Sequence, residues 1–290
     1  MSVVVGYRAG NIGLSGLNLA AGAARTLKTS LTVATIVPKP WLSLGRGEAE
    51  YEQWAADLVQ KSVREAERAL FALGEGLEIN YRHRAHRSVS GGLIEVVEEV
   101  GGEILVLGSL PSGGRAQVVV GTTADWLLHS SPVPVAISPP EYRSHPGGLT
   151  RLTCAYSATP QSADVVRRCV EYSERFHVPL RVVTFAVRGK TMYPPEVGLD
   201  AEDVVLEAWA SQARDILDGL KSDGIVGDDV TLQVVTGHNW AEALEGTEWI
   251  DGEILVIGTS PRGDIRRVFL GARSGKIIRH SPVPVLVLPG

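Results

Sequence analysis

The chain carries an internal duplication, which constrains its fold more than any other feature. The segment GEILVLG at residues 102–108 returns as GEILVIG at 252–258, and SPVPV at 131–135 returns unchanged at 281–285. The two members of each pair lie about 150 residues apart, which is the length of an ordinary domain. A 290-residue chain with this repeat is therefore expected to contain two tandem domains of the same fold.

A stretch rich in proline, glycine and polar residues separates the two copies. It reads PEYRSHPGG from Pro140 onward, and such clusters of turn-forming residues are typical of linkers. We therefore place a first domain at residues 1–140, a linker at 141–149 and a second domain at 150–290.

Composition and charge argue against several classes of protein. Apolar residues make up 44% of the chain and charged residues 21%, as in globular proteins. No apolar run approaches the roughly 18 residues of a membrane helix, and the opening MSVVVG has no basic leader, so we expect a cytoplasmic protein. The net charge of −5 argues against a nucleic-acid partner. Cys154 and Cys169 lack metal-like spacing and are expected to be buried thiols.

Apolar strands alternate with amphipathic helices in both copies. The expected strands are 3–7, 30–37, 77–85, 104–107 and 133–137, then 152–156, 180–186, 230–235, 254–257 and 283–288. The expected helices are 14–27, 48–73, 93–100 and 122–129, then 161–176, 200–220, 240–249 and 273–279. This order predicts an α/β fold of two doubly wound, Rossmann-like domains, each with a five-stranded, mainly parallel sheet and helices on both faces.

The loops that follow the first and fourth strands are the expected ligand site, because ligands of doubly wound sheets bind where the winding reverses. After the fourth strand of the first copy comes a loop of small residues, and hydroxyl residues open the next helix. Glycines let the backbone approach a phosphate, and a helix start offers free N–H groups to an anion. The candidate residues here are Leu107, Gly108, Gly113, Gly114, Gly121, Thr122 and Thr123.

The spacing of these residues resembles the adenine-nucleotide motif of the universal stress protein family, which is Gly, two residues, Gly, nine residues, Gly, then Ser or Thr. In the first copy Gly108, Gly121 and Thr122 are in place, but Pro111 stands where the second glycine belongs. The resemblance extends over nearly the whole chain. It implies that the chain binds ATP or another adenine nucleotide.

The second copy departs further from the motif. Its frame is Gly258, Pro261, Gly271 and Ala272, so the hydroxyl is also missing. Proline removes an N–H group and fixes φ near −65°, which weakens any site that needs glycine there. We therefore expect binding in the first copy and a degenerate site in the second.

Two further positions matter to the resemblance. Nucleotide-binding members of the family carry an acidic residue just after the first strand to hold the nucleoside, and this chain has Arg8 there in one copy and Ser157 in the other. Ile36 and Phe185, at the ends of the second strands, match the family position that packs near the adenine. Ordinary core packing is the alternative explanation for both.

The resemblance implies a stress-response regulator or sensor that is not an enzyme. One alternative is a scaffold of the same fold that binds no nucleotide and acts through protein contacts. Another is a nucleotide hydrolase, which the lack of a recognisable catalytic base or nucleophile motif disfavours.

The repeated SPVPV segment leads into the last strand of each copy. Proline is tolerated at sheet edges. The resemblance to universal stress proteins also implies pairing here, because members of that family commonly pair through this strand. We expect the two halves to pair here about a pseudo-two-fold axis, and a further homodimer is a second expectation.

Overall fold

The structure is a computed structural model of the 290-residue chain. It describes residues 2–10, 13–39, 48–110, 118–157, 160–187, 199–261, 268–269 and 272–289.

Strands and helices alternate as the sequence predicts, and the α/β fold of two tandem doubly wound domains is confirmed. The first half contains β1 (Ser2–Gly6), α1 (Leu14–Leu27), β2 (Ser30–Pro38), α2 (Glu48–Leu70), β3 (Ile79–His86), α3 (Val89–Val100), β4 (Gly102–Gly108), α4 (Thr122–Ser130) and β5 (Val135–Ser138). The second half contains β6 (Arg151–Ala155), α5 (Pro160–Phe176), β7 (Leu180–Val187), α6 (Leu199–Ser222), β8 (Thr231–Gly237), α7 (Trp240–Glu245), β9 (Glu253–Gly258), β10 (Ser260–Pro261), β11 (Val268–Phe269), α8 (Ala272–His280) and β12 (Val285–Leu288).

Three features differ most from the sequence-based expectation. Helix α3 begins at Val89 rather than at residue 93, because the Ser88 side chain caps it there. Helix α7 ends at Glu245 rather than at residue 249, because Gly246 closes it and the chain then turns toward β9. The loop after β9 contains the two short strands β10 and β11, which pair as an antiparallel hairpin that contacts α4 of the other half. Strands of two residues are too short to produce a periodic pattern in the sequence.

Within the described residues, ten strands form one continuous sheet in the order β3-β2-β1-β4-β5-β12-β9-β6-β7-β8. Neighbouring strands are parallel inside each half, whereas β5 and β12 pair antiparallel, with Ala136 opposite Leu286. The prediction that the last strands of the two halves pair with each other is therefore confirmed. Because these edges are used within the chain, the expected homodimer would have to form through another surface.

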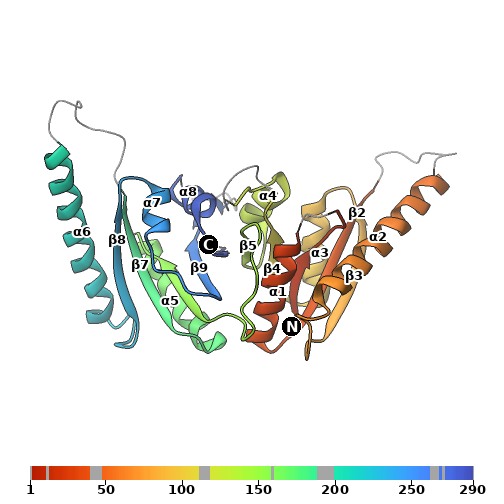
Figure 1. The fold of residues 1–290 in the computed structure, drawn as a ribbon, viewed down its shortest axis with the longest axis horizontal. Coiled ribbons are helices and arrows are strands. Elements are labelled where there is room, and N and C mark those ends of the chain that lie inside the picture. Colours follow the sequence, from red (N-terminus) through yellow and green to blue (C-terminus); the bar gives the residue numbers. More distant parts are fainter. Residues whose placement is uncertain are drawn as a thin grey trace.

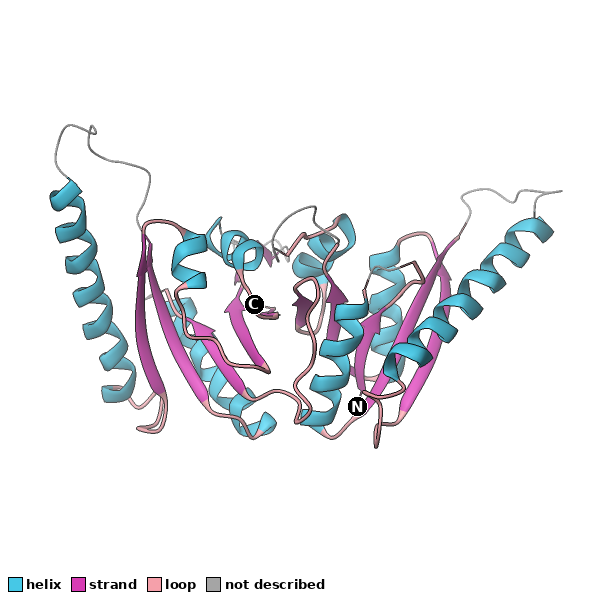
Figure 2. Cartoon of the chain, viewed as in Figure 1, coloured by secondary structure: helices cyan, strands magenta, loops and turns pink. Residues whose placement is uncertain are grey.

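Helices cover both faces of this sheet, and side chains alternate between the faces along each strand. Val3 and Val5 of β1 pack in the core with residues of α1 and α2, while Val4 packs in the core with residues of α3 and α4. The sheet is strongly twisted between its helical layers (Figure 2), and α2 and α6 lie at opposite ends of the molecule (Figure 1). Because the helices pack against both faces of the sheet, the ends of the parallel strands and the first turns of the helices are held in position.

The halves are also tied together beside the central strands. The N–H group of Leu149 donates to Thr26 Oγ1 of α1 (2.7 Å), and the Leu149 side chain is buried. Arg175 of α5 forms an ion pair with Glu103 of the first half. These contacts join the segment between the halves to the helical layer that contains α1 and α5.

Cys154 and Cys169 are both free and buried, as the sequence predicts, and burial raises the pKa of the Cys169 thiol well above its usual range. None of the described helices has the length and apolar character needed to cross a bilayer.

Candidate ligand-binding site

A cavity of about 540 Å³ opens in the first half, beside the point where the strand order reverses between β1 and β4. Its walls come from the loop after β1, the ends of β2 and β4, and the first turns of α3 and α4. The lining residues are Gly6, Tyr7, Arg8, Ala9, Gly13, Ala34, Ile36, Val89, Leu93, Leu107, Gly108, Leu110, Gly121, Thr122, Thr123 and Ala124. The cavity thus lies at the position expected for a ligand of a doubly wound sheet.

Most candidate residues of the first copy meet at this cavity. Those that line it are Arg8, Ile36, Leu107, Gly108, Gly121, Thr122 and Thr123. Pro111, Gly113 and Gly114 lie outside the described residues, as does Gly271 of the second copy. Gly258 ends β9 in the other half and is not part of this cavity.

Several lining residues were not among the candidates. Ala34 lies two residues before Ile36 on β2 and faces the same side, so strand alternation is a signal that could have found it. Val89 and Leu93 belong to the first turns of α3, which approaches the cavity only through the packing of that helix on the sheet. Tyr7 follows β1 directly and lines the cavity, and its hydroxyl contacts α2, which is distant in sequence.

That contact is made by α2, which holds the loop after β1. Tyr7 Oη donates to Glu65 Oε2 (3.2 Å), and the N–H group of Gly10 donates to the same oxygen (3.2 Å). The N–H group of Ala9 donates to Ser62 Oγ (3.0 Å). Burial, reinforced by the Glu65 carboxylate, raises the pKa of Tyr7 to about 12. The Tyr7 hydroxyl therefore keeps its proton at neutral pH and serves as a fixed donor to Glu65.

Arg8 differs from its neighbours in this loop. Its side chain is exposed and lines the cavity, and it has no hydrogen-bond or ion-pair partner within the described ranges. A guanidinium remains charged at physiological pH and offers several N–H donors in one plane. The cavity lining thus carries a positive charge that is available to a ligand.

Another part of the cavity wall is the start of α4. Gly121 is its N-cap residue, and no side chain caps the helix there. The N–H groups of the first turn have no partner inside a helix, so they and the hydroxyls of Thr122 and Thr123 are available to an anion. The preceding segment is fixed, because Val119 N–H donates to Ser109 Oγ (2.8 Å).

Gly108 is required by packing at the end of β4. A Cβ atom built on Gly108 would lie 2.7 Å from Gly13 Cα, and one on Gly16 would lie 2.8 Å from the Gly108 nitrogen. The backbones of β4 and the start of α1 therefore approach too closely for any side chain. Gly121 is different, since its Cβ would meet only the flexible end of Leu110 at 3.0 Å.

We expect Gly108→Ala to lower the free energy of unfolding by about 1–3 kcal/mol, because two backbone segments must move apart. Gly121→Ala should change it by less than about 0.5 kcal/mol, since Gly121 has a φ of −77° and a yielding neighbour. Urea denaturation followed by circular dichroism measures both variants. Equal losses would show that close packing does not distinguish these two glycines.

The second half fills the equivalent space with larger side chains. When the two halves are compared, Phe185 of β7 corresponds to Ile36 of β2. Trp240 corresponds to Val89, because each is the first residue after the N-cap of its helix. The rings of Phe185 and Trp240 are in contact, with centroids 6.1 Å apart. Phe185 is thus part of an aromatic pair that occupies the region where the first half has its cavity.

The glycine contact at the end of the fourth strand is also altered in the second half. Val165 of α5 replaces Gly16, and its Cγ2 would lie 2.1 Å from a Cβ on Gly258. A side chain therefore packs where two glycines meet in the first half. The packing of Val165 and of the aromatic pair makes the two halves unequal, as their motifs predict.

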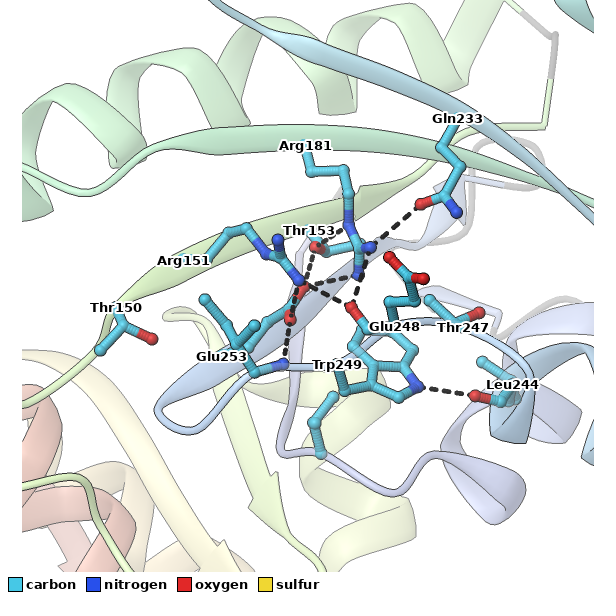
Figure 3. Close-up of polar contacts among 12 residues, drawn as sticks. Thr150, Arg151, Thr153, Arg181, Gln233, Leu244, Thr247, Glu248, Trp249 and Glu253 are labelled. Carbon is cyan, nitrogen blue, oxygen red and sulfur yellow. Dashed lines mark hydrogen bonds and ion pairs between the residues drawn. The ribbon is translucent and has the colours of Figure 1, made fainter.

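A buried charged cluster lies at the other end of the second-half strands (Figure 3). Glu253, which is fully buried, pairs with Arg151 (Nη2 to Oε2, 2.6 Å) and Arg181 (Nη2 to Oε1, 2.7 Å). The Arg181 guanidinium also stacks 5.2 Å from the centre of the Trp249 ring. These residues lie at the starts of β6, β7 and β9, so they are remote from the ligand-binding end of the sheet.

The cluster anchors the chain that leads from α7 into β9. The N–H group of Ile250 donates to Glu253 Oε2 (3.0 Å), and the Glu248 carbonyl accepts from Arg151 (2.8 Å) and Arg181 (3.2 Å). The sequence-based interpretation missed this cluster, because its members come from three separate strands.

The first half contains a small hydroxyl pair in the corresponding place. Ser2 Oγ and Thr32 Oγ1, on β1 and β2, lie 2.8 Å apart. The pairing of β1 with β4 is also irregular here, because Ser2 faces Gly102 while Val3 faces Ile104. Glu103, which lies between Gly102 and Ile104, therefore has no residue opposite it on β1.

The family model of the Universal stress protein family matches residues 1–139 and, a second time, residues 148–289. The chain belongs to this family. Universal stress proteins of Mycobacterium tuberculosis and Mycobacterium bovis are each 63% identical to it over 292 aligned residues, covering 100% of both chains.

Solved structures agree in fold over the full length. A universal stress protein from Archaeoglobus fulgidus superposes with a TM-score of 0.64 at 17% identity, covering 99% of this chain and 98% of that one. A functionally unknown protein from Pseudomonas aeruginosa superposes with a TM-score of 0.58 at 14% identity, covering 99% and 92%. At these identities the likeness concerns the arrangement of the two halves rather than their ligands.

Proposed function

We propose that this universal stress protein is a non-enzymatic regulator that binds an adenine nucleotide in its first half. The cavity at the strand-order reversal is the observation that carries the proposal. Its volume of about 540 Å³ lies within the usual range of about 300–1,000 Å³ for small-molecule sites. Ile36, Leu93 and Leu107 supply apolar surface for a base, and the start of α4 supplies donors for phosphate oxygens.

Binding without hydrolysis is the second part of the proposal. Among the described residues that line the cavity there is no aspartate, glutamate or histidine. General-base catalysis most often uses such a group within hydrogen-bond reach of the attacking water. Tyr7 also lines the cavity, but its raised pKa of about 12 keeps its hydroxyl protonated. We therefore expect the bound nucleotide to persist and to act as a signal rather than as a substrate.

The second half supports the binding of nucleotide by one half only. Phe185 and Trp240 occupy the space of the base, and Ala272 lacks the hydroxyl of Thr122. We propose that this half stabilises the molecule and presents surface to a protein partner.

Two measurements on the full chain test the proposal. Freshly purified protein is denatured and the released small molecules are identified by mass spectrometry, and ligand-free protein is then titrated calorimetrically with AMP, ADP and ATP. A single site per chain is expected. No released nucleotide together with no heat at millimolar concentrations would favour the scaffold alternative, and ADP accumulating from ATP would favour a hydrolase.

We expect Thr122→Ala to weaken nucleotide binding about tenfold to a hundredfold, because a hydrogen bond to a charged phosphate contributes roughly 1.5–3 kcal/mol. Ser130→Ala is the matched control. It removes a hydroxyl from the other end of α4, where Ser130 Oγ donates to the Trp126 carbonyl (2.7 Å). Calorimetry should leave this control at the wild-type affinity, and an equal loss in both variants would argue against phosphate at the helix start.

A further inference from the structure

Two groups of polar residues in the lining of the first-half cavity offer hydrogen-bond donors. Arg8 lies on the loop after β1, and Thr122 and Thr123 lie at the start of α4. The described lining contains no carboxylate that could accept a hydrogen bond from a ribose hydroxyl. An unmodified nucleoside therefore finds no charged acceptor for its sugar among the described lining residues.

Glu65 is an acid that contacts this loop, but its carboxylate already accepts hydrogen bonds from the loop itself. It approaches from α2 and accepts through Oε2 from the Tyr7 hydroxyl and the Gly10 N–H group. It is not among the residues that line the cavity. The loop is thus held by a carboxylate on its outer side and presents a guanidinium to the ligand.

The exchange of an acid for an arginine has a known physical consequence in nucleotide sites. In dinucleotide-binding Rossmann sites a carboxylate accepts a hydrogen bond from a free ribose hydroxyl, and an arginine near that place accommodates a phosphate on the ribose instead. The planar guanidinium forms two parallel, charge-assisted hydrogen bonds with phosphate oxygens. Arg8 has the exposure, the charge and the unused donors for this role.

We propose that the first-half cavity selects an adenine nucleotide that carries a second phosphate on its ribose, at the 2′ or 3′ position. Arg8 binds this phosphate, and the start of α4 with Thr122 binds the 5′-phosphate. The assignment rests on the proposed nucleotide site and names the class of ligand that the site takes.

The test is a calorimetric titration of the full chain with AMP, adenosine 3′,5′-bisphosphate and adenosine 2′,5′-bisphosphate. We expect one bisphosphate to bind wild-type protein at least tenfold more tightly than AMP. Arg8→Ala should abolish this preference, and Arg8→Asp should reverse it in favour of AMP. Arg64→Ala is the control for net charge, because Arg64 lies on the exposed face of α2 and should leave the preference intact.

The outcomes separate the two proposals. Equal binding of AMP and both bisphosphates by the wild type would overturn the assignment and leave nucleotide binding standing. A preference that survives in Arg8→Ala would show that another group recognises the second phosphate. No binding of AMP or of either bisphosphate would overturn the assignment, and it would overturn the proposed function as well only if ADP and ATP also fail to bind.

Discussion

Glu253→Ala is expected to lower the free energy of unfolding by about 3–5 kcal/mol, because it leaves two arginines without their partner. Glu253 is fully buried, and the Arg181 side chain is only 4% exposed, so water cannot replace the lost carboxylate there. The substitution also frees the Ile250 N–H group. Urea denaturation of the variant and the wild type measures the difference.

Glu103→Ala is the matched control, since Glu103 has the corresponding place in the first copy. Its partner Arg175 is 45% exposed, and exposed pairs contribute about 1 kcal/mol or less. The two variants thus remove the same side chain from equivalent strands. A loss for Glu253→Ala no larger than that for Glu103→Ala would show that the buried cluster does not stabilise the fold.

Ile36→Phe combined with Val89→Trp is expected to weaken nucleotide binding by at least about a hundredfold, because overfilled sites lose contacts and must distort. The second half already holds this aromatic pair between the same two elements, so the variant should remain folded. Calorimetry measures the affinity, and circular dichroism at increasing temperature verifies the fold.

A control with the same increase in side-chain size uses exposed positions on α6. Val204→Trp with Ile216→Phe enlarges side chains that are 64% and 37% exposed and far from the cavity. Its affinity should match that of the wild type. Unchanged affinity in a folded Ile36→Phe, Val89→Trp variant would place the ligand outside the cavity and refute the proposed site.

The sequence predicted the fold well because the fold depends on repeated local patterns. The apolar strands and the SPVPV segments predicted the alternation of strands and helices in each half and the pairing of β5 with β12. The end of α7 was wrong by four residues, since a glycine cap and the distant arginines Arg151 and Arg181 draw the next segment toward β9.

The candidate site was predicted only in part. The motif identified Gly108, Gly121 and Thr122, which all line the cavity. It did not identify Tyr7 or Val89, which reach the cavity through packing against other elements. The sequence indicated that the second copy had diverged, but contact between Phe185 and Trp240 becomes visible only when β7 and α7 are placed side by side.

The antiparallel pairing of β5 with β12 has a consequence for how such a molecule can evolve. In a dimer of identical chains, any substitution appears in both subunits, so losing one site means losing both. Here the two partners are parts of one polypeptide, and their association does not depend on protein concentration. Aromatic residues could therefore replace smaller ones in the second half while the first half kept its cavity, because a substitution in one half does not appear in the other.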